Sequence, residues 1–216
     1  DKGVSCTSLV ELKHHLRWDD SMDGQDITTP WIDRAGISIL AYAVALNEVQ
    51  VVKQILKLYD DRKSDLLAWR FAREGVIEVG IPGELTALIC AMCFGGPDIV
   101  AELLEVGAEV HSTDVMGNDP LMAACGFGRL DNVIEWFKRM PEWKINKSNR
   151  RFGATALHIA VYMGPRKLDL VKYLVKTKTA DVFALNNSGA SVLTLACSNE
   201  DADPKVIQYL IQETRI

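Results

Sequence analysis

The sequence predicts an all-α solenoid, in which pairs of short antiparallel helices stack in the order of the chain. Four small or apolar positions recur at one fixed spacing. The recurring pairs, all 33 residues apart, are Leu88 and Leu121, Ala91 and Ala124, Gly95 and Gly128, and Val100 and Val133. The same register returns in segments that begin at Ser38, Thr155 and Ser191. A fixed period in this range is typical of an array built from one supersecondary unit.

Each repeat predicts two helices with different apolar faces. In the first helix, Leu121 and Ala124 are three residues apart and share a face, and the small alanine allows a neighbouring helix to approach closely. The second helix carries larger apolar residues, such as Ile99, Val100 and Leu103. No single repeat can bury these faces alone, so we expect each repeat to cover the next.

The starts of the first helices are also readable. Thr86, Thr155 and Ser191 each precede an apolar helical pattern, where a hydroxyl can accept a hydrogen bond from a free backbone N–H. Pro120 stands where the first helical residue needs no N–H donor. These residues predict helices that begin directly after them.

Three longer segments match one known repeat family. They read "GAEVHSTDVMGNDPLMAA" at 107–124, "TALHIA" at 155–160 and "ADVFALNNSGAS" at 180–191. The pattern resembles the ankyrin repeat, in which a β-turn is followed by two short antiparallel helices. In that family, successive helix pairs are joined by hairpin loops called fingers. The resemblance covers residues 33–216 and implies an ankyrin-repeat solenoid.

The register divides the chain into an N-terminal segment, five repeat units and one insertion. Val52 and Leu88 are 36 residues apart, whereas the equivalent Val100 and Leu121 are 21 apart, so 15 extra residues separate the first two units. The repeat units are predicted at about 33–60, 83–110, 114–140, 150–177 and 186–213, with the insertion at about 61–82. The insertion contains "DLLAWRFA", which favours one or two helical turns.

Residues 1–32 predict a capping or degenerate repeat. Ser8 and Glu11 have the spacing of a capping box, and Leu9, Leu12 and Leu16 follow at helical spacing. The chain begins at Asp1 rather than Met, and we therefore expect it to be a piece of a longer protein.

Composition excludes several classes of function. The net charge of −5 disfavours binding to nucleic acid or to anionic membranes, since both need excess Lys and Arg. No apolar run reaches the length of a membrane span, and no signal-peptide pattern is present. The five cysteines, an odd number, are interpreted as reduced, buried thiols of an intracellular protein. We expect a cytoplasmic protein, with the nucleus as the alternative.

Few residues are candidates for catalysis or metal binding. Cys90 and Cys93 form a CxxC pair, which can bind metal or take part in redox reactions, but no second pair or suitably spaced His accompanies them. Helix packing is the favoured interpretation of both. The resemblance implies that His158 in "TALH" bonds to a neighbouring backbone. No nucleophile, base and oxyanion donor occur together, so we expect no enzyme activity, cofactor or metal.

The resemblance places partner contacts on the finger tips and on the concave face formed by the first helices. The residues it assigns to partner binding are Leu46, Phe94, Val115, Met116, Phe127, Arg151, Phe152, Tyr162 and Met163. An exposed apolar row of this kind usually marks an interface. Alternatively, the long finger "NKSNRRFG" folds back and buries these rings. Lys147, Arg150 and Arg151 add either a rim for an acidic partner or a solvated charge run.

Two functions remain open at this point. The first is a protein-interaction module that holds a protein or peptide partner in its groove. The second is a regulatory or assembly segment of a larger protein, such as a channel, kinase or cyclase, which docks within its own chain or oligomer. The fold alone does not identify the partner.

Overall fold

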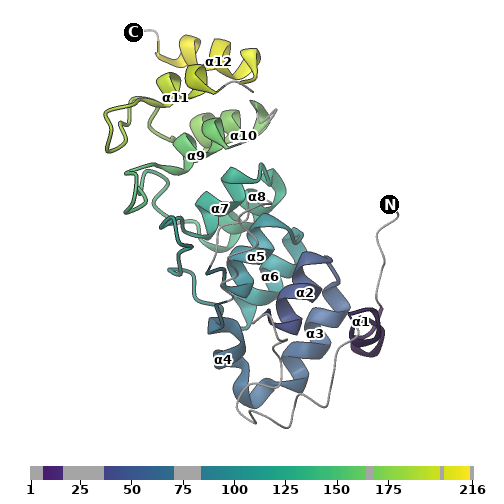
Figure 1. Ribbon diagram of the computed structural model, residues 1–216. Coiled ribbons are helices and arrows are strands. Elements are labelled where there is room, and N and C mark those ends of the chain that lie inside the picture. The colour runs from purple at the N-terminus through teal and green to yellow at the C-terminus, as the bar shows by residue number, and fades with distance from the viewer. Residues whose placement is uncertain (1–6, 17–36, 71–83, 164–167, 200–201, 215–216) are drawn as a thin grey trace. The chain divides into compact units, whose positions relative to one another are not determined.

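The computed structural model describes residues 7–16, 37–70, 84–163, 168–199 and 202–214 of the chain (Figure 1). The chain divides into two compact units, residues 1–114 and residues 115–216. The described residues form α-helices and no β-sheet, and strand-like pairing there is limited to single bridges such as Ser148 with Thr155 and Leu185 with Ser191. The predicted all-α fold is confirmed.

The described residues of unit 1 form two stacked helix pairs and two additional α-helices. Its helices are α1 (Leu9–His15), α2 (Ile39–Ala45), α3 (Val49–Leu58), α4 (Lys63–Ala68), α5 (Ala87–Cys93) and α6 (Pro97–Glu105). Helix α2 pairs with α3, and α5 pairs with α6. The pairs stack because α2 packs on α5 and α3 packs on α6, while α1 lies against α3 and α4 lies against α5 (Figure 1).

In unit 2, the part of the chain that the structure describes forms three stacked helix pairs. Its helices are α7 (Pro120–Gly126), α8 (Leu130–Arg139), α9 (Ala156–Tyr162), α10 (Leu168–Lys172), α11 (Val192–Ser198) and α12 (Pro204–Thr214), and α10 continues as a π-helical turn, η4 (Tyr173–Thr177). The first helices pack in chain order, α7 on α9 and α9 on α11, and α10 packs on α12 (Figure 1). This is the predicted stacking of consecutive repeats.

Side-chain caps fix where the first helices begin. The cap residues, whose side-chain oxygens accept an N–H from the residue three positions later, are Ser38, Thr86, Asp119, Thr155 and Ser191. Pro120 follows Asp119 at the first position of α7, as the sequence predicts. Each cap satisfies one backbone donor that the helix itself cannot pair.

The capping box predicted for α1 forms only in part. Ser8 Oγ accepts the N–H of Glu11 at 3.2 Å, as expected. The Glu11 carboxylate, however, accepts the backbone N–H and the hydroxyl of Thr7, at 2.6 and 2.9 Å, rather than the N–H of Ser8. Thr7 offers two donors to one carboxylate oxygen, which explains the preference. Leu12 on this helix is fully buried.

The two helices of a repeat bury different fractions of their surface. Every residue of α5 and of α7 is buried, and both helices are rich in small side chains. The second helix α8 is amphipathic: it buries Val133, Trp136 and Phe137 and exposes Ile134 and Lys138. Helices α5 and α7 are therefore enclosed within their own units, whereas α11 buries only Val192 and Ala196.

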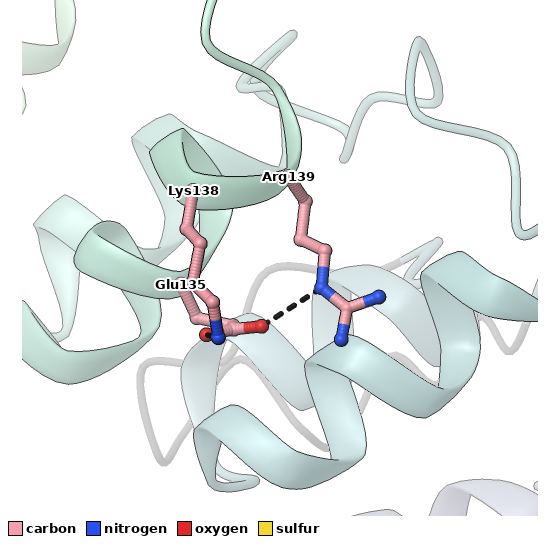
Figure 2. A network of polar contacts seen from close by, with 3 residues as sticks. All are labelled: Glu135, Lys138 and Arg139. Atoms are coloured by element: carbon pink, nitrogen blue, oxygen red, sulfur yellow. Dashed lines mark hydrogen bonds and ion pairs between the residues drawn. The ribbon is translucent and has the colours of Figure 1, made fainter.

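A charged network lies on α8 (Figure 2). The Glu135 carboxylate contacts Lys138 Nζ at 3.1 Å and Arg139 Nε at 2.9 Å. These i,i+3 and i,i+4 pairs place both cations in the last turn of the helix, where the backbone dipole also favours positive charge.

The predicted insertion at 61–82 is helical in its described part. It begins in the short 3₁₀ turn η2 (Asp60–Arg62) and continues into α4, whose Leu66 and Leu67 are buried. Trp69 is half-buried, and Phe71 lies outside the described residues. The exact boundaries of the five repeat units stay a prediction.

Candidate functional site

The residues that could have carried chemistry are engaged in packing. Cys90 and Cys93 are both buried in α5, and burial raises the pKa of the Cys90 thiol to about 12, so that this thiol stays protonated. Cys125 is also buried, but Cys197 is exposed, which corrects the expectation that the cysteines lie inside. In the described parts of the chain, no group of three His, Cys, Asp or Glu side chains could hold a metal ion.

His158, in helix α9, is a structural residue that holds the finger before α11. Its Nδ1 accepts the backbone N–H of Thr155 at 3.2 Å, which assigns the ring proton to Nε2. Nε2 then donates to the carbonyl of Ala190 at 3.3 Å. The ring is fully buried and joins the start of α9 to the finger before α11. The backbone contact implied by the resemblance is confirmed.

Three of the predicted partner-binding residues of unit 2 stand at the C-terminal ends of first helices. Tyr162 and Met163 at the end of α9 are 55% and 39% exposed, and Phe127 at the end of α7 is half-buried. A Cβ placed on Gly126 would lie 3.7 Å from Met163 Sδ, so these two helix ends lie side by side. On the other side, Asn199 Nδ2 donates to the Tyr162 carbonyl at 2.9 Å. The helix ends therefore form a continuous row, called here the helix-end row.

Four further predicted residues stand on finger tips of unit 2. The three tips, each followed by a glycine, are residues 115–116, 150–152 and 187–188. Val115 and Phe152 are 43% and 42% exposed, Arg151 is exposed and Met116 is half-buried. Arg151 Nη1 donates to Met116 Sδ at 3.5 Å, and Asn187 N donates to the Phe152 carbonyl at 2.8 Å. Each tip thus contacts the next one, and together they form the tip row.

The second finger, residues 141–155, is held by its base. Trp143 packs edge-on against the buried Trp136 of α8, with ring centroids 5.0 Å apart. Lys147 Nζ lies 5.2 Å above the Trp143 ring and 3.6 Å from the Asp119 carboxylate. Of the three residues in the predicted basic rim, Lys147 is therefore already paired.

Asn149 fixes the turn above this base. Its buried side chain accepts the N–H groups of Phe152 and Ala154 at 2.9 and 3.2 Å and donates to Asn118 Oδ1 at 2.8 Å. These hydrogen bonds hold the second finger against the preceding finger, to which Asn118 belongs. Its long loop leaves Phe152 and Tyr162 exposed and does not fold back over them.

Unit 1 carries the two remaining predicted residues. Leu46, at the end of α2, is 37% exposed, and Phe94, at the end of α5, is half-buried. The turns that follow these residues are joined, because Asn47 Oδ1 accepts the N–H of Gly96 at 2.6 Å. Within unit 1, the two helix ends lie side by side as they do in unit 2.

On the described parts of the fingers, the sequence prediction missed two exposed apolar residues. Phe183 and Leu185, on the third finger, are 56% and 62% exposed. The repeat alignment does contain a signal for them: the equivalent positions of the second finger are the polar Asn146 and Ser148, so apolar residues are unusual there. Comparing equivalent finger positions across repeats would have found them.

Two protein-family models match this chain. The model for three copies of ankyrin repeats matches residues 121–216, and the model for a single ankyrin repeat matches residues 84–115. Together the matches cover more than half of the chain and coincide with the helix pairs from α5 to α12. The chain belongs to the ankyrin-repeat family. Ankyrin repeats are generally protein–protein interaction modules and are typically not enzymes.

The helix-end row and the tip row contain the residues of unit 2 that the sequence predicted for partner binding, and that role stays a prediction. Within the described ranges, none of the helices has the length and apolar character needed to cross a membrane. The helix-end row and the tip row are therefore the surfaces to consider for the function of this ankyrin array.

Proposed function

We propose that this ankyrin array binds a protein or peptide partner through its helix-end residues and finger tips. The proposed contacts are Leu46 and Phe94 in unit 1, and Val115, Met116, Phe127, Arg151, Phe152, Tyr162 and Met163 in unit 2. The observation that carries the proposal is the exposure of Tyr162, Met163 and Phe152 at positions that recur from repeat to repeat. Exposed apolar clusters are uncommon on monomers unless something covers them.

The two rows of unit 2 differ in what they offer. The helix-end row presents aromatic and thioether side chains, which suit an apolar anchor of the partner. The tip row presents Val115 and Phe152 beside the Arg151 guanidinium. Hydrogen bonds between successive tips and helix ends hold both rows, so the surface needs little reorganisation to bind.

Photo-crosslinking at Tyr162 tests the proposal. A photoreactive phenylalanine analogue at Tyr162 should crosslink to a specific protein in a lysate of the native cell, whereas the same analogue at Ile134 should not. Ile134 is a matched control, because it is 42% exposed on the opposite type of helix, α8. Equal crosslinking at both positions would contradict the proposal.

Tyr162→Ser then measures the energy of the contact. Since Tyr162 is more than half exposed, the substitution should leave the melting temperature nearly unchanged. Loss of an aromatic anchor worth about 2 kcal/mol should weaken binding of the crosslinked partner more than about tenfold. Phe127 is a poorer choice for this experiment, because its half-buried ring also contributes to the fold.

Assembly within a larger protein or an oligomer is the second candidate. It is favoured by one face of α12, which carries Pro204, Ile207, Gln208, Ile211 and Gln212 and lies outside the proposed surface. If copies of the chain dock there, the mass measured by light scattering should rise with concentration, and Ile211→Asp should abolish the rise.

A further inference from the structure

The tip of the second finger is one residue longer than the tip of the third finger. In the second finger, Gly153 N donates to the Asn149 carbonyl at 3.0 Å, and three residues, 150–152, lie between them. In the third finger, Gly189 N donates to the Asn186 carbonyl at 2.9 Å, and only Asn187 and Ser188 lie between. The extra residue makes room for two arginines and a phenylalanine in one turn.

Both arginines of this tip are exposed. Neither Arg150 nor Arg151 forms an ion pair with any carboxylate in the parts of the chain that the structure describes. The three tips of unit 2 contain no Asp or Glu, so these two residues supply all of their formal charge. The charge is positive, in a chain whose net charge is −5.

The tip is also held in shape before any partner arrives. The Arg151 guanidinium lies 5.4 Å from the centre of the Phe152 ring, and its Nη1 contacts Met116 Sδ. Gly153 has a φ of +64°, and a Cβ there would lie 2.9 Å from the backbone N of Asn187. The third finger therefore fits closely against the back of this turn.

We propose that the tip formed by Arg150, Arg151 and Phe152 binds an acidic segment of the partner protein, with carboxylates on the arginines and an apolar side chain against Phe152. Guanidinium groups bind carboxylates through paired hydrogen bonds, and such pairs give both orientation and specificity. This inference rests on the proposed function, because it names the chemistry of the partner on the same surface.

A protein segment fits the tip better than a nucleic acid or an anionic membrane does. Polyphosphates gain affinity by engaging many cations at once, and this tip offers two. Its neighbours are Val115 and Met116 on one side and the uncharged Asn187 on the other, while the whole chain repels polyanions. Two cations beside an exposed ring instead match a carboxylate-rich segment with one apolar anchor.

Selection from a phage-displayed library of random peptides tests the inference on the full chain. Peptides enriched on the wild type should contain excess Asp and Glu next to an aromatic or aliphatic residue. Arg150→Glu/Arg151→Glu should abolish the acidic excess and weaken a peptide selected on the wild type by about tenfold or more. Binding of that peptide should also weaken as salt is added.

Lys57→Glu/Lys205→Glu is the matched control, because it changes the net charge equally at two exposed lysines outside the tips. This control should retain the acidic excess. The inference is overturned if selected peptides show no acidic excess, if none is sensitive to the tip variant, or if single-stranded DNA or phosphatidylserine vesicles bind more tightly than the peptides. If the inference is overturned but Tyr162 still crosslinks to a specific protein, the proposed function stands. If Tyr162 forms no specific crosslink, both the proposed function and this inference fail.

Discussion

Buried polar residues, one at a time, set the positions of the fingers in unit 2. Asn149 satisfies two backbone donors of the second finger and also contacts Asn118. His158 connects the start of α9 to the third finger through Thr155 and Ala190. Each of these side chains is buried, so removing it would leave several backbone groups without a partner. The exposed tips depend on these supports beneath them.

His158 should make stability depend on pH. Burial lowers the pKa of its ring below the ordinary value, against the opposing effects of the Ala190 carbonyl and of Asp181. The unfolded chain therefore takes up a proton that the folded chain resists, and stability should fall as the pH drops through the usual histidine range near 6.5. Melting temperatures measured across this range should fall less steeply for His158→Gln.

His111→Gln, which removes an exposed histidine, is the control for this measurement. A wild-type melting temperature that does not change between neutral and mildly acidic pH would contradict the assignment. The His158 variant should also be less stable than the wild type at neutral pH, because it loses the contact with Ala190.

Among the elements, α8 shows how a second helix combines packing with charge. Its buried side holds Trp136, on which Trp143 of the second finger rests. Its charged side holds the Glu135 network of Figure 2. Burial works against ionisation of Glu135, but hydrogen bonds from Arg139 and Lys138 outweigh it and lower the pKa of this carboxyl. The same helix therefore supports a finger and stabilises itself electrostatically.

Glu135→Gln should test that electrostatic contribution. Two helical pairs, both to the poorly exposed Glu135 carboxylate, should stabilise the protein by about 0.5–1 kcal/mol at neutral pH. Because the folded pKa is lowered, this stability is present above the ordinary glutamate pKa and is lost as the pH falls through the folded value. Urea denaturation of both proteins should show a difference at neutral pH that shrinks in acid. A difference independent of pH would indicate lost packing instead.

For the whole molecule, stability should come from contacts between neighbouring repeats. Within each unit, the helices pack in chain order, and the described residues form no sheet that would join distant segments. In such an array, each repeat is stabilised mainly by the repeats beside it. Local damage should therefore spread along the stack and weaken with distance.

Leu157→Ala provides the test, because Leu157 is 1% exposed in α9, between α7 and α11. The cavity should destabilise the protein by about 2–4 kcal/mol. Hydrogen exchange should accelerate most in α7, α9 and α11 and least in α2 and α3. Ile134→Ala, on an exposed position, should leave exchange nearly unchanged. Uniform acceleration along the whole chain would show that the array unfolds as one cooperative body.

Much of this architecture depends on residues close together in the sequence and could therefore be predicted from the sequence. The repeat spacing predicted which helices pack together, and Thr86, Thr155 and Ser191 predicted where three of them begin. Capping and helical periodicity involve residues a few positions apart, so they leave a signal in the sequence. Of the capping box predicted at Ser8, only the Ser8 half is confirmed, because Thr7 donates to the Glu11 carboxylate.

The sequence by itself determined the repeat, the helix starts and the positions that could face a partner. Only the tertiary structure decided which side chains at those positions stay exposed. Tyr162 and Phe152 are exposed, whereas Phe127 is half-buried, because exposure depends on the neighbouring repeat and on how its finger stands. Asp119 and Asn118, which precede α7 in the chain, contact Lys147 and Asn149 of the second finger. Contacts between residues so far apart are set by packing, and no local pattern encodes them.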